Sequence, residues 1–319
     1  MRRYTGHHTG REPAEEHKGA EISVAVSQPF DLRLSVECGQ AFRWNRIGEN
    51  YYCVLGRRIL KIRQHGRTLK ASLSPDTGFF GVLGLIGDVF RFDDDIDSII
   101  HEISVDKIIA EAVMRYRGLR IIRQDPWECL VSYLCSINSN IPRIRKDVER
   151  LSDAFGEEIT FDGLKFSTFP TVSSLAEASE TELRKLRLGF RAKYISSAAR
   201  RIRDEGVDLL SLRRMGYEEA FNLLTEFDGV GPKVADCVLL FSLDKLEAFP
   251  VDRWVKRAVE ILYFDGREMP ASRVREWASE HFGAYAGYAQ EYLFYGSRLR
   301  EIVASAPGSR PETPLPELV

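Results

Sequence analysis

The residues best suited to chemistry lie between positions 217 and 260, where two predicted helices flank a short loop, Asp228-Gly229-Val230-Gly231-Pro232. Two glycines around one apolar residue permit positive φ angles and a close backbone approach, and proline suits the first turn of the next helix. The exposed N–H groups of such a loop can bind a phosphate without reading bases. A plain turn between two helices would use the same residues, so the glycines alone leave both interpretations open.

Lys233 follows this loop, in the first turn of the second helix, where the positive end of the helix dipole disfavours a cation. Such a departure from local preference is typical of a functional site. The same field would lower the pKa of the amine and favour its neutral, nucleophilic form. The competing interpretation is a surface lysine close to a phosphate backbone.

Asp252 is the second candidate, between Pro250-Val251 and the helical pattern that begins at Trp254. An Asp at this place is most often a helix N-cap. Nineteen residues separate it from Lys233, enough for a helix, a turn and a return, so both residues can lie at neighbouring helix N-termini. An amine beside a carboxylate is an acid–base pair suited to Schiff-base chemistry.

The elements that must position these residues change in character along the chain. Residues 21 to about 90 alternate apolar and polar side chains between turn residues, which predicts an antiparallel sheet. From about residue 98 the periodicity is helical, with helices expected over 143–155, 173–186, 193–205, 216–227, 232–243, 253–263, 271–281 and 284–302, and one opened by Asp125-Pro126. We therefore predict an α+β chain with a disordered arm (1–20), an antiparallel sheet domain (21–115), an all-helical region (116–303) and a loose tail (304–319).

Composition and charge exclude several classes of protein. The net charge of −2 lacks the basic excess of many DNA-binding proteins, although residues 183–203 contain eight basic residues and no acidic one. A solvated helix face would explain that run equally well. The five cysteines show neither a disulfide framework nor zinc-ligand spacing, and no apolar run is long enough for a signal peptide or a membrane span. We expect an intracellular protein without a membrane partner, in the cytoplasm or nucleoid, or in the nucleus of a eukaryote.

Several motifs together resemble one family. Gly231-Pro232-Lys233 followed by Pro250-Val251-Asp252 resembles the helix-hairpin-helix-GPD glycosylase superfamily. Its 8-oxoguanine DNA glycosylase branch is similar from about residue 28 to 300, through Cys38-Gly39-Gln40-Ala41-Phe42-Arg43-Trp44, Arg123-Gln124-Asp125-Pro126, Asn138-Ser139-Asn140-Ile141, Gly189-Phe190-Arg191-Ala192-Lys193-Tyr194 and Ala286-Gly287-Tyr288-Ala289-Gln290. No cysteine follows Cys237, whereas two related branches carry a four-cysteine iron–sulfur cluster after the catalytic Asp.

The resemblance implies a catalytic role for Lys233 and Asp252. A glycosylase takes its target base out of the duplex and holds it in a pocket. Lys233 would then attack the sugar C1′, expel the base and form a Schiff base, and strand cleavage by β-elimination would follow. Asp252 would stabilise the positive charge that develops on the sugar and would orient the amine.

The resemblance also assigns base recognition to Gly39, Gln290, Phe294 and Cys237. 8-Oxoguanine carries an N7–H donor where guanine has an acceptor, so a backbone carbonyl at Gly39 would accept from the damaged base and repel the normal one. Gln290 would read the Watson–Crick edge, while Cys237 and Phe294 would sandwich the base. The helical core spacing of Cys237 and Phe294 fits an ordinary packing role equally well.

The remaining assignments concern DNA. By resemblance, Asn138 fills the space left by the flipped base, Arg143 and Arg191 contact the cytosine opposite, and Phe190 acts as an aromatic wedge. The backbone at Gly229 and Gly231 would bind phosphate, as would the basic run. Trp254 stands where many members of the family have a histidine that contacts a phosphate. No metal or other cofactor is required, although hairpin carbonyls could hold a structural monovalent cation.

Together these observations predict a bifunctional DNA glycosylase and abasic-site lyase. Its partner would be duplex DNA containing 8-oxoguanine opposite cytosine, and it would act as a monomer. Two alternatives are the same fold acting on another damaged purine, and a non-enzymatic DNA-binding module that uses the hairpin only to hold phosphate. A phosphate clamp needs neither Lys233 nor Asp252, which argues against the second alternative.

Overall fold

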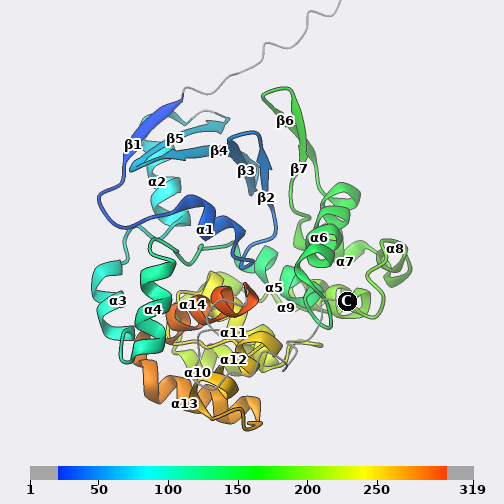
Figure 1. The fold of residues 1–319 in the computed structure, drawn as a ribbon. Helices are drawn as coiled ribbons and strands as arrows, with labels where there is room; N and C mark the ends of the chain where they lie inside the picture. The colour runs from blue at the N-terminus through cyan, green and yellow to red at the C-terminus, as the bar shows by residue number, and fades with distance from the viewer. Residues whose placement is uncertain (1–20, 76, 300–319) are drawn as a thin grey trace, which may run out of the picture.

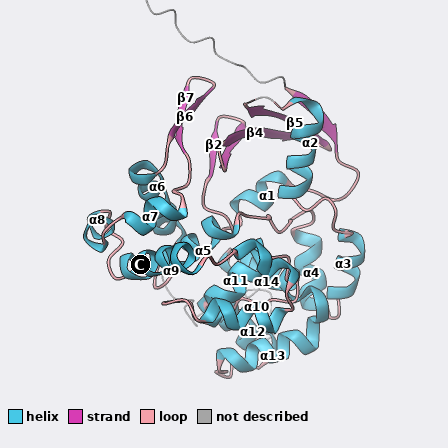
Figure 2. Cartoon of the chain, turned by 180° about the vertical axis from the view of Figure 1, so that it is seen from behind, coloured by secondary structure: helices cyan, strands magenta, loops and turns pink. Residues whose placement is uncertain are grey.

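The computed structural model describes residues 21–75 and 77–299, which form a sheet region and a larger helical region (Figure 1). The arm predicted for residues 1–20 and the tail predicted for residues 304–319 lie outside the described residues. In both views the sheet lies at one end of the molecule, and helix α13 (Ala271–Phe282) lies at the opposite end (Figures 1 and 2). The predicted order of an antiparallel sheet followed by a helical region is confirmed.

The main sheet has five antiparallel strands in the order β1-β5-β4-β3-β2. It pairs Ile62 of β4 with Ala71 of β5 and with Tyr51 of β3, so apolar residues of neighbouring strands share a face. That face forms a core with helix α2 (Gly78–Val89), to which Val82, Ile86 and Val89 contribute. The strands are β1 (Ile22–Ala25), β2 (Trp44–Ile47), β3 (Asn50–Leu55), β4 (Arg58–His65) and β5 (Thr68–Ser74).

Helices also occur in the region predicted as a sheet domain. Helix α1 (Leu32–Glu37) begins at the N-cap Asp31 and connects β1 to β2. Helices α3 (Ile96–Ile103) and α4 (Lys107–Arg115) lie inside the range 21–115, yet their buried isoleucines belong to the core of the helical region. The alternating pattern ends before residue 90, and α3 and α4, which follow it, pack against the helical region.

The helical region contains α5 to α14 among the described residues. Ser179 splits the stretch 173–186 into two helices, because its hydroxyl and the carboxylate of Glu182 form a reciprocal capping box at the start of the second. The helices are α5 (Pro126–Cys135), α6 (Ile141–Phe155), α7 (Val172–Glu177), α8 (Glu180–Lys185), α9 (Arg191–Glu205), α10 (Tyr217–Thr225), α11 (Pro232–Ser242), α12 (Arg253–Tyr263), α13 and α14 (Ala286–Arg298), with short 3₁₀ helices at Leu209–Arg214 and Gly283–Tyr285.

A two-stranded hairpin interrupts this helical region, which was expected to be all helical. Strands β6 (Glu158–Phe161) and β7 (Leu164–Ser167) are joined by Asp162 and Gly163, both with positive φ. Asp162 accepts hydrogen bonds from Lys61 and Tyr52 of the main sheet, and Phe161 packs with Tyr52. The hairpin stands beside the main sheet in Figure 1 and links that sheet to the helical region, from which it extends.

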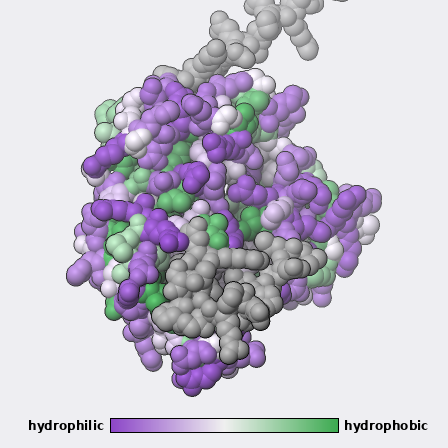
Figure 3. Space-filling model, viewed as in Figure 1, coloured by the Kyte–Doolittle hydropathy of each residue, from purple (hydrophilic) through white to green (hydrophobic). Residues whose placement is uncertain are grey.

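Where the described residues can be seen from the viewpoint of Figure 1, their surface is mostly hydrophilic, with small hydrophobic patches (Figure 3). Within the described part of the chain, no helix is long and apolar enough to span a membrane. All five cysteines are buried and none forms a disulfide.

Candidate active site

The predicted hairpin lies between α10 and α11, and its two glycines have different roles. Gly229 has a φ of +82°, and a Cβ there would lie 2.5 Å from the ring of Tyr194. Gly231 is extended, with a φ of −88°, and a Cβ there would meet nothing within 4 Å. The fold therefore requires a glycine at position 229, whereas the space beside Gly231 is left open at the surface of the loop.

Lys233 lies in the first turn of α11, as predicted, and its amine points toward the end of α5. Nζ donates a hydrogen bond to Oγ of Ser136 at 2.9 Å and lies 5.0 Å from the centre of the Tyr133 ring. Ser136 is the C-cap of α5, where the helix dipole is negative and favours a cation. The negative C-terminal end of α5 thus offsets the unfavourable positive field at the N-terminal end of α11.

Asp252 is the N-cap of α12, and its carboxylate accepts from the N–H of Val255 at 2.8 Å. Burial raises the pKa of Asp252, while the positive charge of Lys233 and the N–H groups of Val255 and Trp254 act to lower it. Capping and electrostatic coupling to Lys233 therefore coexist in one side chain. The hydrogen bond of the amine goes to Ser136, so in the free protein Ser136 orients Lys233, a role that was expected of Asp252.

Gly39 lies between two tightly held neighbours. The Gln40 side-chain amide donates to the backbone carbonyl of Ser35 at 3.0 Å and to that of Arg120 at 2.7 Å. The backbone of Gly39 is buried with a φ of +108°, and within residues 21–75 and 77–299 neither its N–H nor its carbonyl has a hydrogen-bond partner. A buried, unpaired backbone carbonyl is costly, so it marks a place where a ligand donor could be accepted.

The other predicted base-recognition residues lie on α11 and α14. Gln290 is only 4% exposed, and its Oε1 has no partner among the described residues. Phe294, one helical turn further along α14, is partly buried against the core. Cys237 is buried one turn after Lys233, and burial raises the pKa of its thiol to about 12, which keeps it neutral.

Tyr133 connects the two parts of this site. Its ring lies beneath the Lys233 amine, and its hydroxyl donates to the carbonyl of Gln40 at 2.9 Å. Glu291 of α14 is also buried here, its Oε1 has no hydrogen-bond partner among the described residues, and burial raises its pKa to about 7. Sequence reasoning missed both residues, because an apolar helix and a buried carboxyl next to Gln290 carry no motif of their own.

The residues expected to contact the opposite strand form a second group. Arg191 donates to the carbonyls of Ile137 and Asn138, the latter at 2.7 Å, and is almost fully buried. Arg143 donates from Nε to both oxygens of the buried Asp147 at 3.2 Å and from Nη2 to a backbone carbonyl at position 187. The two arginines are therefore held by protein groups in the free state.

Phe190 lies beside this group and is 43% exposed. Its ring contacts the guanidinium of Arg191, whose Cζ is 4.9 Å from the ring centre, and the edge of Tyr194. Asn138, in the loop two residues after the C-cap Ser136 of α5, has a φ of +48°. Adjacent residues of that one loop thus contact Lys233 and Arg191, which links the two groups.

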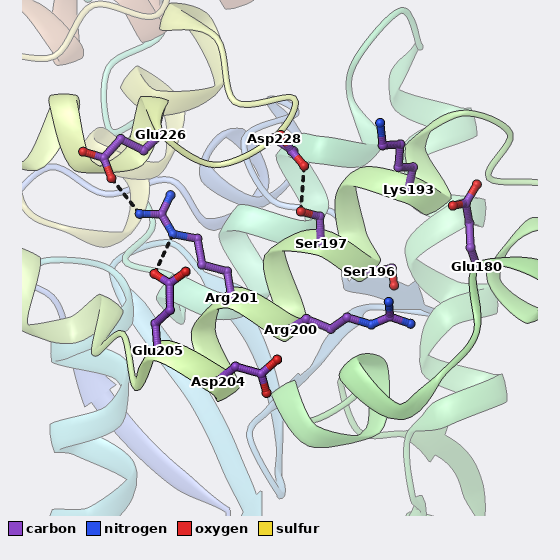
Figure 4. A pocket seen from close by; sticks show the side chains of 10 residues that line it. All are labelled: Glu180, Lys193, Ser196, Ser197, Arg200, Arg201, Asp204, Glu205, Glu226 and Asp228. Atoms are coloured by element: carbon purple, nitrogen blue, oxygen red, sulfur yellow. Dashed lines mark hydrogen bonds and ion pairs between the residues drawn. The ribbon is translucent and has the colours of Figure 1, made fainter.

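Helix α9 carries much of the basic run, and a groove on its exposed face contains both signs of charge (Figure 4). Arg201 pairs with Glu205 at 3.0 Å and with Glu226 at 2.6 Å, and Ser197 donates to Asp228 of the hairpin loop at 2.8 Å. Acidic residues from outside the run therefore neutralise part of it. The groove is lined by Glu180, Lys193, Ser196, Ser197, Arg200, Arg201, Asp204, Glu205, Glu226 and Asp228, and by none of the predicted base-recognition residues.

Comparison with known proteins gives a consistent assignment. Residues 22–130 match the model of the 8-oxoguanine DNA glycosylase N-terminal domain, and residues 131–282 match that of the HhH-GPD superfamily base excision DNA repair proteins. N-glycosylase/DNA lyase OGG1 of Arabidopsis thaliana is 36% identical over 281 residues, covering 82% of this chain and 76% of its own. The chain belongs to the 8-oxoguanine DNA glycosylase family.

Two further relatives extend this similarity within the family. N-glycosylase/DNA lyase of Saccharomyces cerevisiae is 32% identical, covering 87% of this chain and 86% of its own. The solved structure of Clostridium acetobutylicum 8-oxoguanine glycosylase/lyase, bound to double-stranded DNA with cytosine opposite 8-oxoguanine, is 32% identical with a TM-score of 0.81 and covers 88% of this chain and 98% of its own. The similarity spans both the sheet and the helical region.

Within residues 21–75 and 77–299 no three or more His, Cys, Asp or Glu side chains are grouped to hold a metal ion. A monovalent cation on the carbonyls of the hairpin would use other ligands, and it stays a prediction.

Proposed function

We propose that the protein removes 8-oxoguanine from duplex DNA in which cytosine is the opposite base, and then cleaves the strand as an abasic-site lyase. The observation that carries this proposal is the placement of the Lys233 amine, held by Ser136 above Tyr133 and electrostatically coupled to Asp252. The names of the relatives in this family support the same activity. A phosphate clamp would require none of these arrangements.

The chemistry follows from the residues in this site. The Lys233 ammonium first loses a proton to solvent; its amine then attacks C1′, the bond from C1′ to N9 breaks, and the electron pair of that bond leaves with the base, which takes up a proton. Asp252 stabilises the positive charge that develops on the sugar. The nitrogen now bonded to C1′ then loses a proton, the bond from C1′ to O4′ breaks, O4′ takes up a proton, and the opened sugar is held as a Schiff base. Loss of a C2′ proton expels the 3′-phosphate and breaks the strand.

Base recognition is proposed for the two unpaired acceptors of the site. The carbonyl of Gly39 would accept from N7–H of 8-oxoguanine, and Oε1 of Gln290 would accept from the Watson–Crick edge. Guanine lacks the N7 donor, so the buried Gly39 carbonyl would remain unpaired against it, which disfavours the normal base. Phe294 and Cys237 would lie on the two faces of the base.

DNA contacts are proposed for Asn138, Arg143, Phe190 and Arg191, together with the backbone of the hairpin. Arg143 and Arg191 would have to exchange protein carbonyls and Asp147 for DNA groups, because the free protein already engages their donors. We expect the protein to act as a monomer on one lesion at a time. Analytical ultracentrifugation with and without a lesion duplex would test this.

The decisive experiment is borohydride trapping on a duplex with a single 8-oxoguanine opposite cytosine. The native protein should form a covalent adduct, and Lys233→Gln should form none. Lys107→Gln is the matched control, since Lys107 is an exposed lysine on α4 paired with Glu111. Base loss without an adduct would remove Lys233 from its role, while neither adduct nor base loss would refute the 8-oxoguanine assignment and favour another damaged purine.

A further inference from the structure

The C-terminal end of α1 is capped from another part of the fold. The last carbonyls of a helix have no partner within it, and those of α1 lie directly before Gly39. Arg298, in the last turn of α14, donates from Nη2 to the carbonyl of Glu37 at 3.1 Å and from Nη1 to the carbonyl of Cys38. One guanidinium therefore holds two consecutive carbonyls adjacent to the unpaired backbone of Gly39.

Arg298 also contacts the residue proposed to stack on the base. Its Cζ lies 5.9 Å from the ring centre of Phe294 and 5.4 Å from that of Tyr295. A Cβ added at Gly39 would lie 2.6 Å from Nη1 of Arg298, so the guanidinium fills the space beside the glycine. A planar fork that binds two acceptors and covers a ring is a geometry that lysine cannot reproduce.

A second contact from α14 supports the same segment. Glu291 lies two turns before Arg298 on the helix and close to Cys38: burial raises the pKa of the Cys38 thiol, and the nearby Glu291 carboxylate raises it further. Gln290 and Phe294 lie on the same helix. The distance between the Gly39 carbonyl and these two residues is therefore set by how α14 holds the end of α1.

We propose that Arg298 is a positioning residue for base recognition, which fixes the Gly39 carbonyl relative to Gln290 and Phe294 and thereby sets the discrimination between 8-oxoguanine and guanine. This inference rests on the proposed function. Among the described residues, the hydrogen bonds and ring contacts of Arg298 do not include Lys233, so replacing Arg298 should slow the reaction of a substrate that still has its base. It should matter little for an abasic site, where no base has to be recognised.

The test compares two substrates with one set of variants. Arg298→Met keeps the aliphatic stem and removes the fork, Arg298→Lys keeps the charge, and Arg273→Met is the control, since Arg273 is an exposed arginine on α13. Single-turnover excision of 8-oxoguanine by Arg298→Met should fall about 10- to 100-fold, because small misplacements of a binding group have effects of this size. Cleavage of a preformed abasic site should stay within about threefold, because there is no base for the displaced Gly39 carbonyl to misplace.

Excision of guanine from an undamaged duplex gives the discrimination directly. The ratio of 8-oxoguanine to guanine excision should fall in Arg298→Met, fall less in Arg298→Lys, and stay unchanged in Arg273→Met. Equal losses in 8-oxoguanine excision and in abasic-site cleavage would mean a purely structural role for Arg298 and would overturn the inference. An unchanged ratio of 8-oxoguanine to guanine excision in Arg298→Met would overturn it as well. If the native protein cleaves abasic sites but excises no 8-oxoguanine, the proposed substrate itself is wrong, and that result appears before any variant is compared.

Discussion

Replacing Gly39 with alanine should disrupt base recognition far more than it disrupts the fold. At a φ of +108° an L-residue carries strain of about 1–3 kcal/mol. The added Cβ would also lie 2.5 Å from Cδ1 of Ile141 and 2.6 Å from Nη1 of Arg298. Both are ends of flexible side chains, but Arg298 can move only by releasing the carbonyls of Glu37 and Cys38.

We expect Gly39→Ala to lose about 100-fold in 8-oxoguanine excision, because the carbonyl leaves its place, and to lower the free energy of unfolding by about 1–3 kcal/mol. The matched control is Gly48→Ala in the β2–β3 turn, where φ is +61° and nothing lies within 4 Å of an added Cβ. That change should cost about 1–2 kcal/mol of stability and leave excision unchanged.

The assays are single-turnover excision on an 8-oxoguanine duplex, cleavage of a preformed abasic site, and urea unfolding of each protein. Excision by Gly39→Ala within a few-fold of the native rate would refute the reasoning. So would a matching loss in Gly48→Ala, because it would attribute the effect to general strain and not to the position of the Gly39 carbonyl.

Three further predictions follow from the geometry. Asp252→Asn retains a good N-cap, so the fold should persist while single-turnover excision falls about 10²- to 10³-fold; an undiminished rate would exclude Asp252 from catalysis. Gly229→Ala should lower both the unfolding free energy and DNA affinity, because its Cβ would meet Tyr194, whereas Gly231→Ala should lower only the affinity measured by fluorescence anisotropy; equal stability losses would contradict this. Burial raises the pKa of Glu291 from 4.5 to about 7, so between these pH values the folded state keeps a proton that the unfolded state has lost. The stabilisation of the folded state by this proton is fully present below pH 4.5 and is lost as pH rises through 7. The unfolding free energy of the native protein should therefore fall, relative to that of Glu291→Gln, by about 3 kcal/mol between pH 4.5 and 8, and a constant difference in urea titrations would contradict the prediction.

Local sequence signals predicted much of the architecture. Alternation of apolar and polar residues indicated the main sheet, and the loop with Pro232 and Lys233 placed the start of α11. The β6–β7 hairpin was missed although Asp162-Gly163 is a strong turn signal, because its strands have only four residues each. Its stability depends on Tyr52 and Lys61 of the main sheet, which no local pattern reveals.

The candidate site likewise contains residues that local sequence signals predicted and residues that they missed. Lys233 and Asp252 could be named from the sequence because each occupies a helix start with a local signature. Ser136, Tyr133 and Arg298 could not be named, since their roles depend on partners far away along the chain.

By itself, the sequence determined which residues could react and which helix termini carry them, because glycine, proline and capping residues act through the local backbone. Only the tertiary structure decided how those residues are used. It brings the C-terminal end of α5 to the Lys233 amine, leaves the Gly39 carbonyl buried and unpaired, and places Arg298 across the end of α1. Each of these depends on packing between segments distant in sequence, where burial and geometry determine which polar groups find partners.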